Sequence, residues 1–213
     1  MMIRLIAFDL DGTLSQSDRF LIRSYRQASE RLGAKQPPEG TLRNMIGGSY
    51  IDNRTLMEPY IKPEQFDLFS QYTREFAVKL SEGCAYPGIV DCLEELKGMG
   101  CLPVLCSNGL SDYVEGVLQS EGLRDHFGQL LYGQKSWDKT QVLSYLMDAY
   151  HADQAVMVGD RHFDLEAARG NKIPFIGCAY GLFPEEIQTA DRVVETPLQI
   201  PQAVSELLGM GEL

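Results

Sequence analysis

The sequence predicts an α/β protein: a doubly wound parallel sheet with an all-helical segment inserted after the first strand. Three observations support this. Short apolar segments alternate with amphipathic helical ones, a stretch of about 70 residues holds no strand, and polar residues gather where apolar segments end. Strands separated by helices form parallel sheets with helices on both faces.

Six segments rich in apolar or β-branched residues are predicted strands. They are residues 3–8, 102–107, 128–133, 155–160, 174–179 and 192–194. Pro103 interrupts the second segment. Because proline cannot donate to a ladder, we expect it near the start of that strand. Residues 88–100 and 139–150 carry apolar residues at helical spacing and are predicted helices.

Residues 15–85 contain helical patterns alone, and in 63–80 the side chains of Phe66, Phe69, Phe76 and Leu80 recur at helical spacing. This stretch is too long for a crossover and suits a small second domain. We therefore expect a core domain made of residues 1–14 and 86–213, and a helical domain made of residues 15–85.

Net charge and hydropathy indicate which classes of partner the protein is expected to bind. A net charge of −11 argues against nucleic acid or an anionic membrane surface, since both require clustered Lys and Arg. No apolar run approaches the roughly 18 residues of a membrane span, and the start of the chain does not resemble a signal peptide. We expect a cytoplasmic protein that acts on small molecules, without nucleic-acid or membrane partners.

The first strand ends in Asp9 and Asp11. Residues two apart on an extended strand point the same way, so the two carboxylates would share one space and need a cation or a shared proton. The second strand ends in Ser107-Asn108-Gly109, and the strand at 155–160 ends in Asp160, with Asp164 four residues later. Ligands of open α/β sheets bind at the carboxyl ends of strands, so these residues predict a site there.

The segments DLDGT, SNG, a lysine before a helix, and GDRHFD resemble, in that order, the four motifs of the haloacid dehalogenase-like superfamily. The similarity spans nearly the whole chain, and the layout is similar to phosphoglycolate phosphatase-like members. The helical segment falls where that family carries its C1-type cap. The resemblance implies a magnesium-dependent phosphatase acting on a small phosphomonoester.

The resemblance also implies roles for individual residues. Asp9 would attack phosphorus and form an aspartyl-phosphate, and Asp11 would be the general acid and base. Phosphate binding would fall to Ser107, Asn108, Gly109 and Thr13. Mg²⁺ would be held by Asp9, the Asp11 backbone carbonyl and Asp160, with Asp164 beside them.

The family resemblance implies one lysine that neutralises the phosphoryl group and the attacking carboxylate. Both Lys135 and Lys139 could be that lysine. Asp138 is a good N-cap, which places Lys139 at the first position of the following helix. A positive charge is unfavourable there, so its presence indicates another demand on it. We predict that Lys139 is the catalytic lysine and that Lys135 faces solvent.

Substrate specificity would lie in the cap, where Gly47, Gly48 and Arg54 are candidates, and other arginines of the segment could meet an anion. Those are Arg19, Arg23 and Arg43. The presence of Asp11 argues against a dehalogenase, and Lys35 and Lys62 form no pattern that supports phosphonate hydrolysis. A phosphosugar mutase similar to β-phosphoglucomutase remains open, as does a non-enzymatic phospho-aspartate or binding protein. The sequence leaves the phosphomonoester unspecified.

Overall fold

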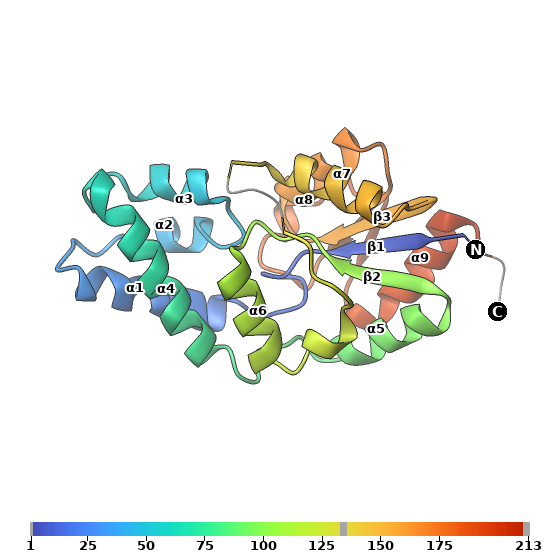
Figure 1. Ribbon diagram of the computed structural model, residues 1–213, viewed down its shortest axis with the longest axis horizontal. Helices are drawn as coiled ribbons and strands as arrows, with labels where there is room; N and C mark the ends of the chain where they lie inside the picture. The colour runs from blue at the N-terminus through green and yellow to red at the C-terminus, as the bar shows by residue number, and fades with distance from the viewer. Residues whose placement is uncertain (1, 133–135, 211–213) are drawn as a thin grey trace.

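The computed structural model describes residues 2–132 and 136–210. Its centre is a five-stranded parallel sheet with strand order β2-β1-β3-β4-β5 (Figure 1). The strands are β1 (Arg4–Phe8), β2 (Cys101–Leu105), β3 (Gln154–Gly159), β4 (Phe175–Cys178) and β5 (Arg192–Val194). The predicted α/β parallel sheet is confirmed.

Helices cover both faces of the sheet and extend beyond one end of it. The α-helices are α1 (Asp18–Arg31), α2 (Glu39–Asn44), α3 (Tyr50–Met57), α4 (Phe66–Leu80), α5 (Ile89–Gly98), α6 (Ser111–Ser120), α7 (Lys139–Ala149), α8 (His162–Gly170) and α9 (Ile200–Leu208). Short 3-10 turns are η1 (Pro63–Gln65), η2 (Arg124–His126), η3 (Pro184–Glu186) and η4 (Pro197–Gln199). Among the described residues, no helix is long and apolar enough to cross a membrane.

Strand β1, between β2 and β3, is buried on both faces, which explains its largely apolar sequence. Alternate side chains of an extended strand point to opposite faces. Accordingly Ile6 and Phe8 belong to the core that includes α5 and α9, while Leu5 and Ala7 belong to the core under α7 and α8. The first polar residue after the buried part of β1 is Asp9, directly after the strand ends.

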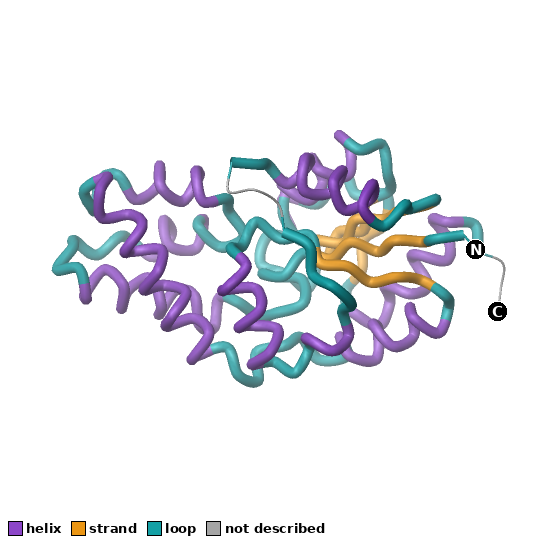
Figure 2. The backbone as a smooth tube through the Cα atoms, viewed as in Figure 1, coloured by secondary structure: helices purple, strands orange, loops and turns teal. Residues whose placement is uncertain are grey.

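Helices α1–α4, here called the helical group, lie together beyond the carboxyl ends of the strands (Figures 1 and 2). The chain leaves the sheet for this group and returns from it at one place. There Gln16 N donates to Cys84 O at 2.8 Å, and Tyr86 N donates to Leu14 O at 2.9 Å. These paired connections support the expected division at residues 15 and 85, which stays a prediction.

One predicted strand is wrong. Residues 128–132 form no strand, and Gly133 lies outside the described residues. Arg124 Nη1 donates to Gly128 O at 3.1 Å, and the Tyr150 hydroxyl donates to Gln129 O. The apolar Leu130 and Leu131 pack against the two cores. Side-chain donors thus supply hydrogen bonds to two backbone carbonyls of this segment, and its leucines are packed, without a partner strand.

The expected position of Pro103 is also wrong. Pro103 is the third of the five residues of β2 and lies opposite Ile6 of β1. Because β2 is at the edge of the described sheet, proline there removes no hydrogen bond to a second neighbour. The edge position, and not the start of the strand, makes proline tolerable.

Candidate active site

The carboxyl ends of β1 and β3 and the start of α7 bring an aspartate and a lysine into contact. Asp9 follows β1, and Lys139 begins α7. Lys139 Nζ donates to Asp9 Oδ1 at 2.6 Å and to Asp164 Oδ1 at 2.5 Å, and all three side chains are buried. Lys135 lies outside the described residues, so the structure offers no comparison with it.

The local sequence explains why α7 begins at Lys139. Asp138 is the N-cap. Its side chain accepts a hydrogen bond from Gln141 N at 2.9 Å, and the Gln141 side-chain oxygen accepts one from Asp138 N at 3.1 Å. Lys139 is 5% exposed even though a cation is unfavourable at a helix N-terminus. The two carboxylates that it contacts offset that cost.

Three carboxylates could hold a cation. Oxygens of Asp9, Asp160 and Asp164 lie within 4.8 Å of one another. Asp160 Oδ2 accepts from Leu182 N at 2.7 Å, whereas Asp160 Oδ1 and Asp9 Oδ2 are buried without a hydrogen-bond partner among the described residues. Buried carboxylate oxygens require a donor or a cation. A hard cation such as Mg²⁺ fits these two oxygens.

Asp164 is placed differently from Asp9 and Asp160. Its Oδ1 accepts from Lys139, and its Oδ2 accepts from Arg161 N at 3.0 Å. Because both oxygens already have partners, Asp164 suits a supporting role that orients Lys139 and the loop after β3. The carboxylate of Asp11 does not belong to this cluster, and a metal contact through its backbone carbonyl stays a prediction.

Burial controls the charge state of the cluster. It raises the pKa of Asp9 to about 7, with Lys139 opposing the shift and Asp164 and Asp11 adding to it. Burial, together with repulsion from Asp164 and Asp9, raises the pKa of Asp160 well above its ordinary value. Burial lowers the pKa of Lys139, but the two carboxylates outweigh it and keep the lysine charged. Three buried carboxylates beside one lysine therefore favour the uptake of a proton or of a cation.

Glycine is required beside this cluster. Gly12 has φ of +82°, and a Cβ there would lie 2.2 Å from Asp160 Oδ2. A side chain at this position would meet both a backbone penalty and a steric clash with the carboxylate. The glycine of the DLDGT segment thus permits the first and third strand ends to approach each other.

The side chain of Asp11 contacts two hydroxyl groups and not the cluster of Asp9, Asp160 and Asp164. Asp11 Oδ1 accepts from Ser17 Oγ at 2.5 Å and from the Tyr113 hydroxyl at 2.5 Å. Burial raises the pKa of Asp11, while these two hydrogen bonds and the charge of Lys139 lower it. Sequence analysis did not single out Ser17 or Tyr113, because neither lies in a motif and Tyr113 is 102 residues from Asp11.

The predicted phosphate-binding residues lie at the carboxyl end of β2 and in the turn after β1. Ser107 Oγ accepts from Gly109 N at 3.0 Å, and Asn108 Nδ2 donates to Gly47 O at 3.0 Å. The Thr13 hydroxyl is buried without a partner among the described residues. Their contact with phosphate stays a prediction.

The predicted substrate residues of the helical segment separate in space. Gly47 and Gly48 line a hollow between the helical group and α6, whereas Arg54 is exposed on α3 and is not among its lining residues. Arg74, which sequence analysis did not single out, lines that hollow. Arg43 Nη2 donates to Leu182 O at 2.9 Å, and Arg19 and Arg23 are exposed.

Arg161, directly after Asp160, joins the helical group to the sheet. Its Nη1 donates to Ile46 O at 2.5 Å and to Asn44 O at 3.2 Å, at the end of α2. Its Nε and Nη2 donate to Glu186 at 3.1 Å each, and its guanidinium lies 3.8 Å from the centre of the Phe183 ring. Five donors in a planar group allow one side chain to hold both segments.

We expect Arg161→Met to lower the free energy of unfolding by about 3 kcal/mol or more, because it removes the arginine donors to Asn44 O and Ile46 O and leaves Glu186 with His162 alone. The matched control is Arg169→Met on α8, since Arg169 is 48% exposed at its ion pair with Asp191. That control should change stability by less than about 1 kcal/mol. Urea unfolding of both variants measures the difference, and equal losses would contradict the bridging role.

Comparisons with known proteins agree with this geometry. The family model of haloacid dehalogenase-like hydrolases matches residues 6–178. This chain belongs to the haloacid dehalogenase-like hydrolases. The predicted family and the predicted enzyme class, a phosphatase, are thereby confirmed, and the alternative of a non-enzymatic protein is set aside.

Individual relatives of this hydrolase cover most of its length. A phosphoglycolate phosphatase of Vibrio vulnificus is 32% identical in an alignment of 195 residues that covers 84% of this chain and 85% of that protein. A 5'-nucleotidase of Pseudomonas aeruginosa is 27% identical in an alignment of 188 residues that covers 85% of each protein. The crystal structure of a predicted phosphatase from Clostridium acetobutylicum superposes with a TM-score of 0.82 at 24% identity, covering 97% of this chain and 100% of that one. The last similarity concerns the fold.

Proposed function

We propose that this hydrolase is a Mg²⁺-dependent phosphomonoesterase that works through an aspartyl-phosphate on Asp9. The observation that carries the proposal is the buried cluster of Asp9, Lys139, Asp160 and Asp164, in which Asp9 Oδ2 and Asp160 Oδ1 have no partner among the described residues. Bound Mg²⁺ would be held by Asp9 and Asp160 and would neutralise the charge of the transferring phosphoryl group.

The residues of the chain divide the reaction into two steps. The Asp9 carboxylate attacks phosphorus as the ester P–O bond breaks, and Asp11 gives its proton to the leaving alcohol. Water then attacks the aspartyl-phosphate, Asp11 takes the proton of that water, and inorganic phosphate leaves with Asp9 restored. Lys139 holds the attacking carboxylate in place and supplies positive charge beside it.

The raised pKa of Asp11 supports its proposed role, because a carboxyl group must be protonated to serve as an acid. The hydroxyls of Ser17 and Tyr113 fix its position. Phosphoglycolate is one candidate substrate, given the name of the Vibrio vulnificus relative, and a nucleoside 5'-phosphate is a second, given the name of the Pseudomonas aeruginosa relative. Release of inorganic phosphate to water separates a hydrolase from the phosphosugar mutase alternative.

Metal removal tests the proposal. EDTA should abolish phosphate release and Mg²⁺ should restore it, whereas the larger Ca²⁺ should substitute poorly. Mg²⁺ should also raise the melting temperature, by an amount equivalent to about 2.7 kcal/mol at a hundred times its dissociation constant. Full activity in chelator would refute the proposal.

A matched pair of variants locates the metal. Asp160→Asn should lose the Mg²⁺-dependent rise in melting temperature, because Asp160 Oδ1 is one of the two buried oxygens without a partner among the described residues. Asp148→Asn, on the exposed side of α7, should keep the rise. An equal rise in both would place the metal elsewhere.

A further inference from the structure

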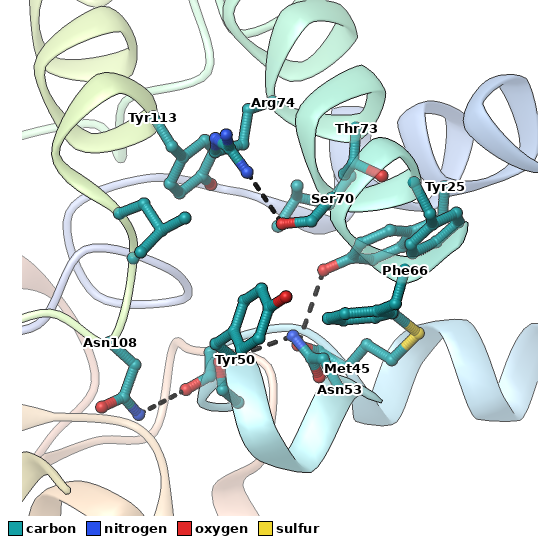
Figure 3. A pocket seen from close by; sticks show the side chains of 16 residues that line it. Tyr25, Met45, Tyr50, Asn53, Phe66, Ser70, Thr73, Arg74, Asn108 and Tyr113 are labelled. Carbon is teal, nitrogen blue, oxygen red and sulfur yellow. Dashed lines mark hydrogen bonds between the residues drawn. The ribbon is translucent and has the colours of Figure 1, made fainter. Parts of the chain in front are cut away.

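A hollow that is open to solvent lies between the helical group and α6 (Figure 3). One wall comes from α1, the loop before α3, α3 itself and α4. The other wall comes from the start of α6 and the loop before it. We call it the α4–α6 pocket; its lining residues are Leu21, Tyr25, Met45, Gly47, Gly48, Tyr50, Asn53, Phe66, Phe69, Ser70, Thr73, Arg74, Asn108, Gly109, Leu110 and Tyr113.

The α4–α6 pocket adjoins the acid side of the reaction centre. Tyr113 lines it and donates its hydroxyl hydrogen bond to Asp11. Asn108 and Gly109, at the predicted phosphate site, line it as well. Asp11 is the group proposed to protonate the leaving alcohol. The part of the substrate next to Asp11, which is the alcohol, therefore meets this pocket.

Five of the sixteen residues that line the pocket are aromatic. Four of these rings form a chain of neighbours. The ring centroids are 4.9 Å apart for Tyr50 and Phe66, 5.9 Å for Phe66 and Phe69, and 6.1 Å for Phe69 and Tyr25. Figure 3 shows Tyr25, Tyr50, Phe66 and Tyr113 around the hollow, with Arg74 bonded to Ser70. Aromatic walls favour flat, apolar ligand surfaces through stacked and edge-on contacts.

Charge is nearly absent from the lining. Arg74 is the one charged side chain among the lining residues, and it is already engaged: Nε donates to Asp112 at 2.8 Å and Nη1 donates to Ser70 Oγ at 2.8 Å. A small carboxylate such as glycolate would face an aromatic surface and an arginine whose charge is paired. Such surroundings disfavour an acidic alcohol.

Two buried oxygens of lining residues lack hydrogen bonds. Thr73 Oγ1 and Asn53 Oδ1 have no partner among the described residues. The Asn53 amide nitrogen reaches Gly48 O at 3.5 Å, which leaves its oxygen available as an acceptor. Buried acceptors without partners are costly, and a ligand donor relieves that cost.

We propose that the α4–α6 pocket binds the alcohol part of the substrate, and that this alcohol is an uncharged molecule with a planar ring bearing N–H or O–H donors. Nucleosides and hydroxylated aryl alcohols share this chemistry. The inference rests on the proposed phosphatase function and deepens it. The ring would lie against the aromatic wall, and its donors would meet Thr73 Oγ1 and Asn53 Oδ1.

A panel of four esters tests the proposal with Mg²⁺ present: adenosine 5'-monophosphate, phenyl phosphate, phosphoglycolate and glycerol phosphate. We expect kcat/KM for adenosine monophosphate to exceed that for phosphoglycolate by at least ~10-fold, because ring burial and paired donors add binding that glycolate cannot supply. Phenyl phosphate carries a ring without N–H or O–H donors. Comparing it with adenosine monophosphate therefore shows whether the pocket recognises the ring alone or also its hydrogen-bond donors. Adenosine should inhibit competitively, and glycolate should not.

A single substitution separates recognition from folding. Thr73→Val keeps the side-chain shape and removes the oxygen, so KM for adenosine monophosphate should rise at least ~5-fold while KM for phenyl phosphate changes less than ~2-fold. Thr55→Val on α3 is the control, because Thr55 is exposed and is not a lining residue of the α4–α6 pocket. It should change neither constant.

The outcomes are distinct. Hydrolysis of none of the four esters would refute the proposed function. Preference for phosphoglycolate, or an equal KM rise for both ring-bearing esters in Thr73→Val, would refute the pocket assignment and leave the proposed function standing.

Discussion

Asp9→Asn should lower phosphatase turnover by at least ~10⁴-fold, in line with the loss of a covalent nucleophile. The amide has nearly the shape of the carboxylate, so the fold should be retained. Burial already raises the pKa of Asp9, and replacing the charged group therefore removes a desolvation cost along with its ion pair to Lys139. Turnover at saturating Mg²⁺, with the melting temperature as a check on folding, measures the effect.

Asp11→Asn is the matched variant, because it makes the same chemical change two residues away. With a good leaving group it should still form the aspartyl-phosphate but hydrolyse it slowly, since water then lacks its base. Mass spectrometry of acid-quenched protein should show phosphorylated Asp11→Asn and unphosphorylated Asp9→Asn. Equal phosphorylation of the two variants would mean that the roles are misassigned.

Lys139→Ala should lower turnover by at least ~100-fold, as expected for the loss of a preorganised charge at the transferring group. Lys139 Nζ is the donor to both Asp9 Oδ1 and Asp164 Oδ1, so its removal leaves two buried carboxylates facing each other. Without Mg²⁺ this should also cost about 3–5 kcal/mol of stability. Added Mg²⁺ should recover part of the stability and little of the turnover.

Two other lysines serve as controls for that result. Lys97→Ala removes an exposed i,i+3 pair with Glu94 and should leave both turnover and stability nearly unchanged. Lys135→Ala should change turnover by less than ~5-fold, as for a solvated charge. A larger loss at Lys135 than at Lys139 would overturn the assignment of the catalytic lysine.

Local sequence signals predicted which residues lie together at the strand ends, while the catalytic roles of these residues stay predictions. The positions of Asp9 and Asp160 followed from apolar strands that end in polar residues, and the position of Lys139 followed from the N-cap at Asp138. Each signal spans only a few residues. The rule that parallel strands end at one edge then brought the residues together, and the structure shows Asp9 and Lys139 in contact.

Contacts between distant, unpatterned residues could not be predicted in this way. Tyr113 meets Asp11 because α6 packs beside the turn after β1, and nothing near Tyr113 in the sequence indicates it. The same holds for Arg161, whose partners at residues 44 and 46 lie more than 100 positions away. The strand predicted at residues 128–133 was wrong for another reason. A short apolar run has no periodicity that distinguishes a strand from a packed loop.

The chain crosses between the sheet and the helical group twice, at residues 14–16 and 84–86. The two crossings are hydrogen-bonded to each other, so any turn of the helical group relative to the sheet would have to change backbone torsions at that one place. Arg161, Asn108 and Arg43 fasten residues 43–47 to the sheet by hydrogen bonds that such a turn would break. Asp9, Lys139, Asp160 and Asp164 all lie on the sheet side and keep their arrangement. Such a turn would therefore leave these four side chains together, and under the proposed function it would change access to them without changing their arrangement.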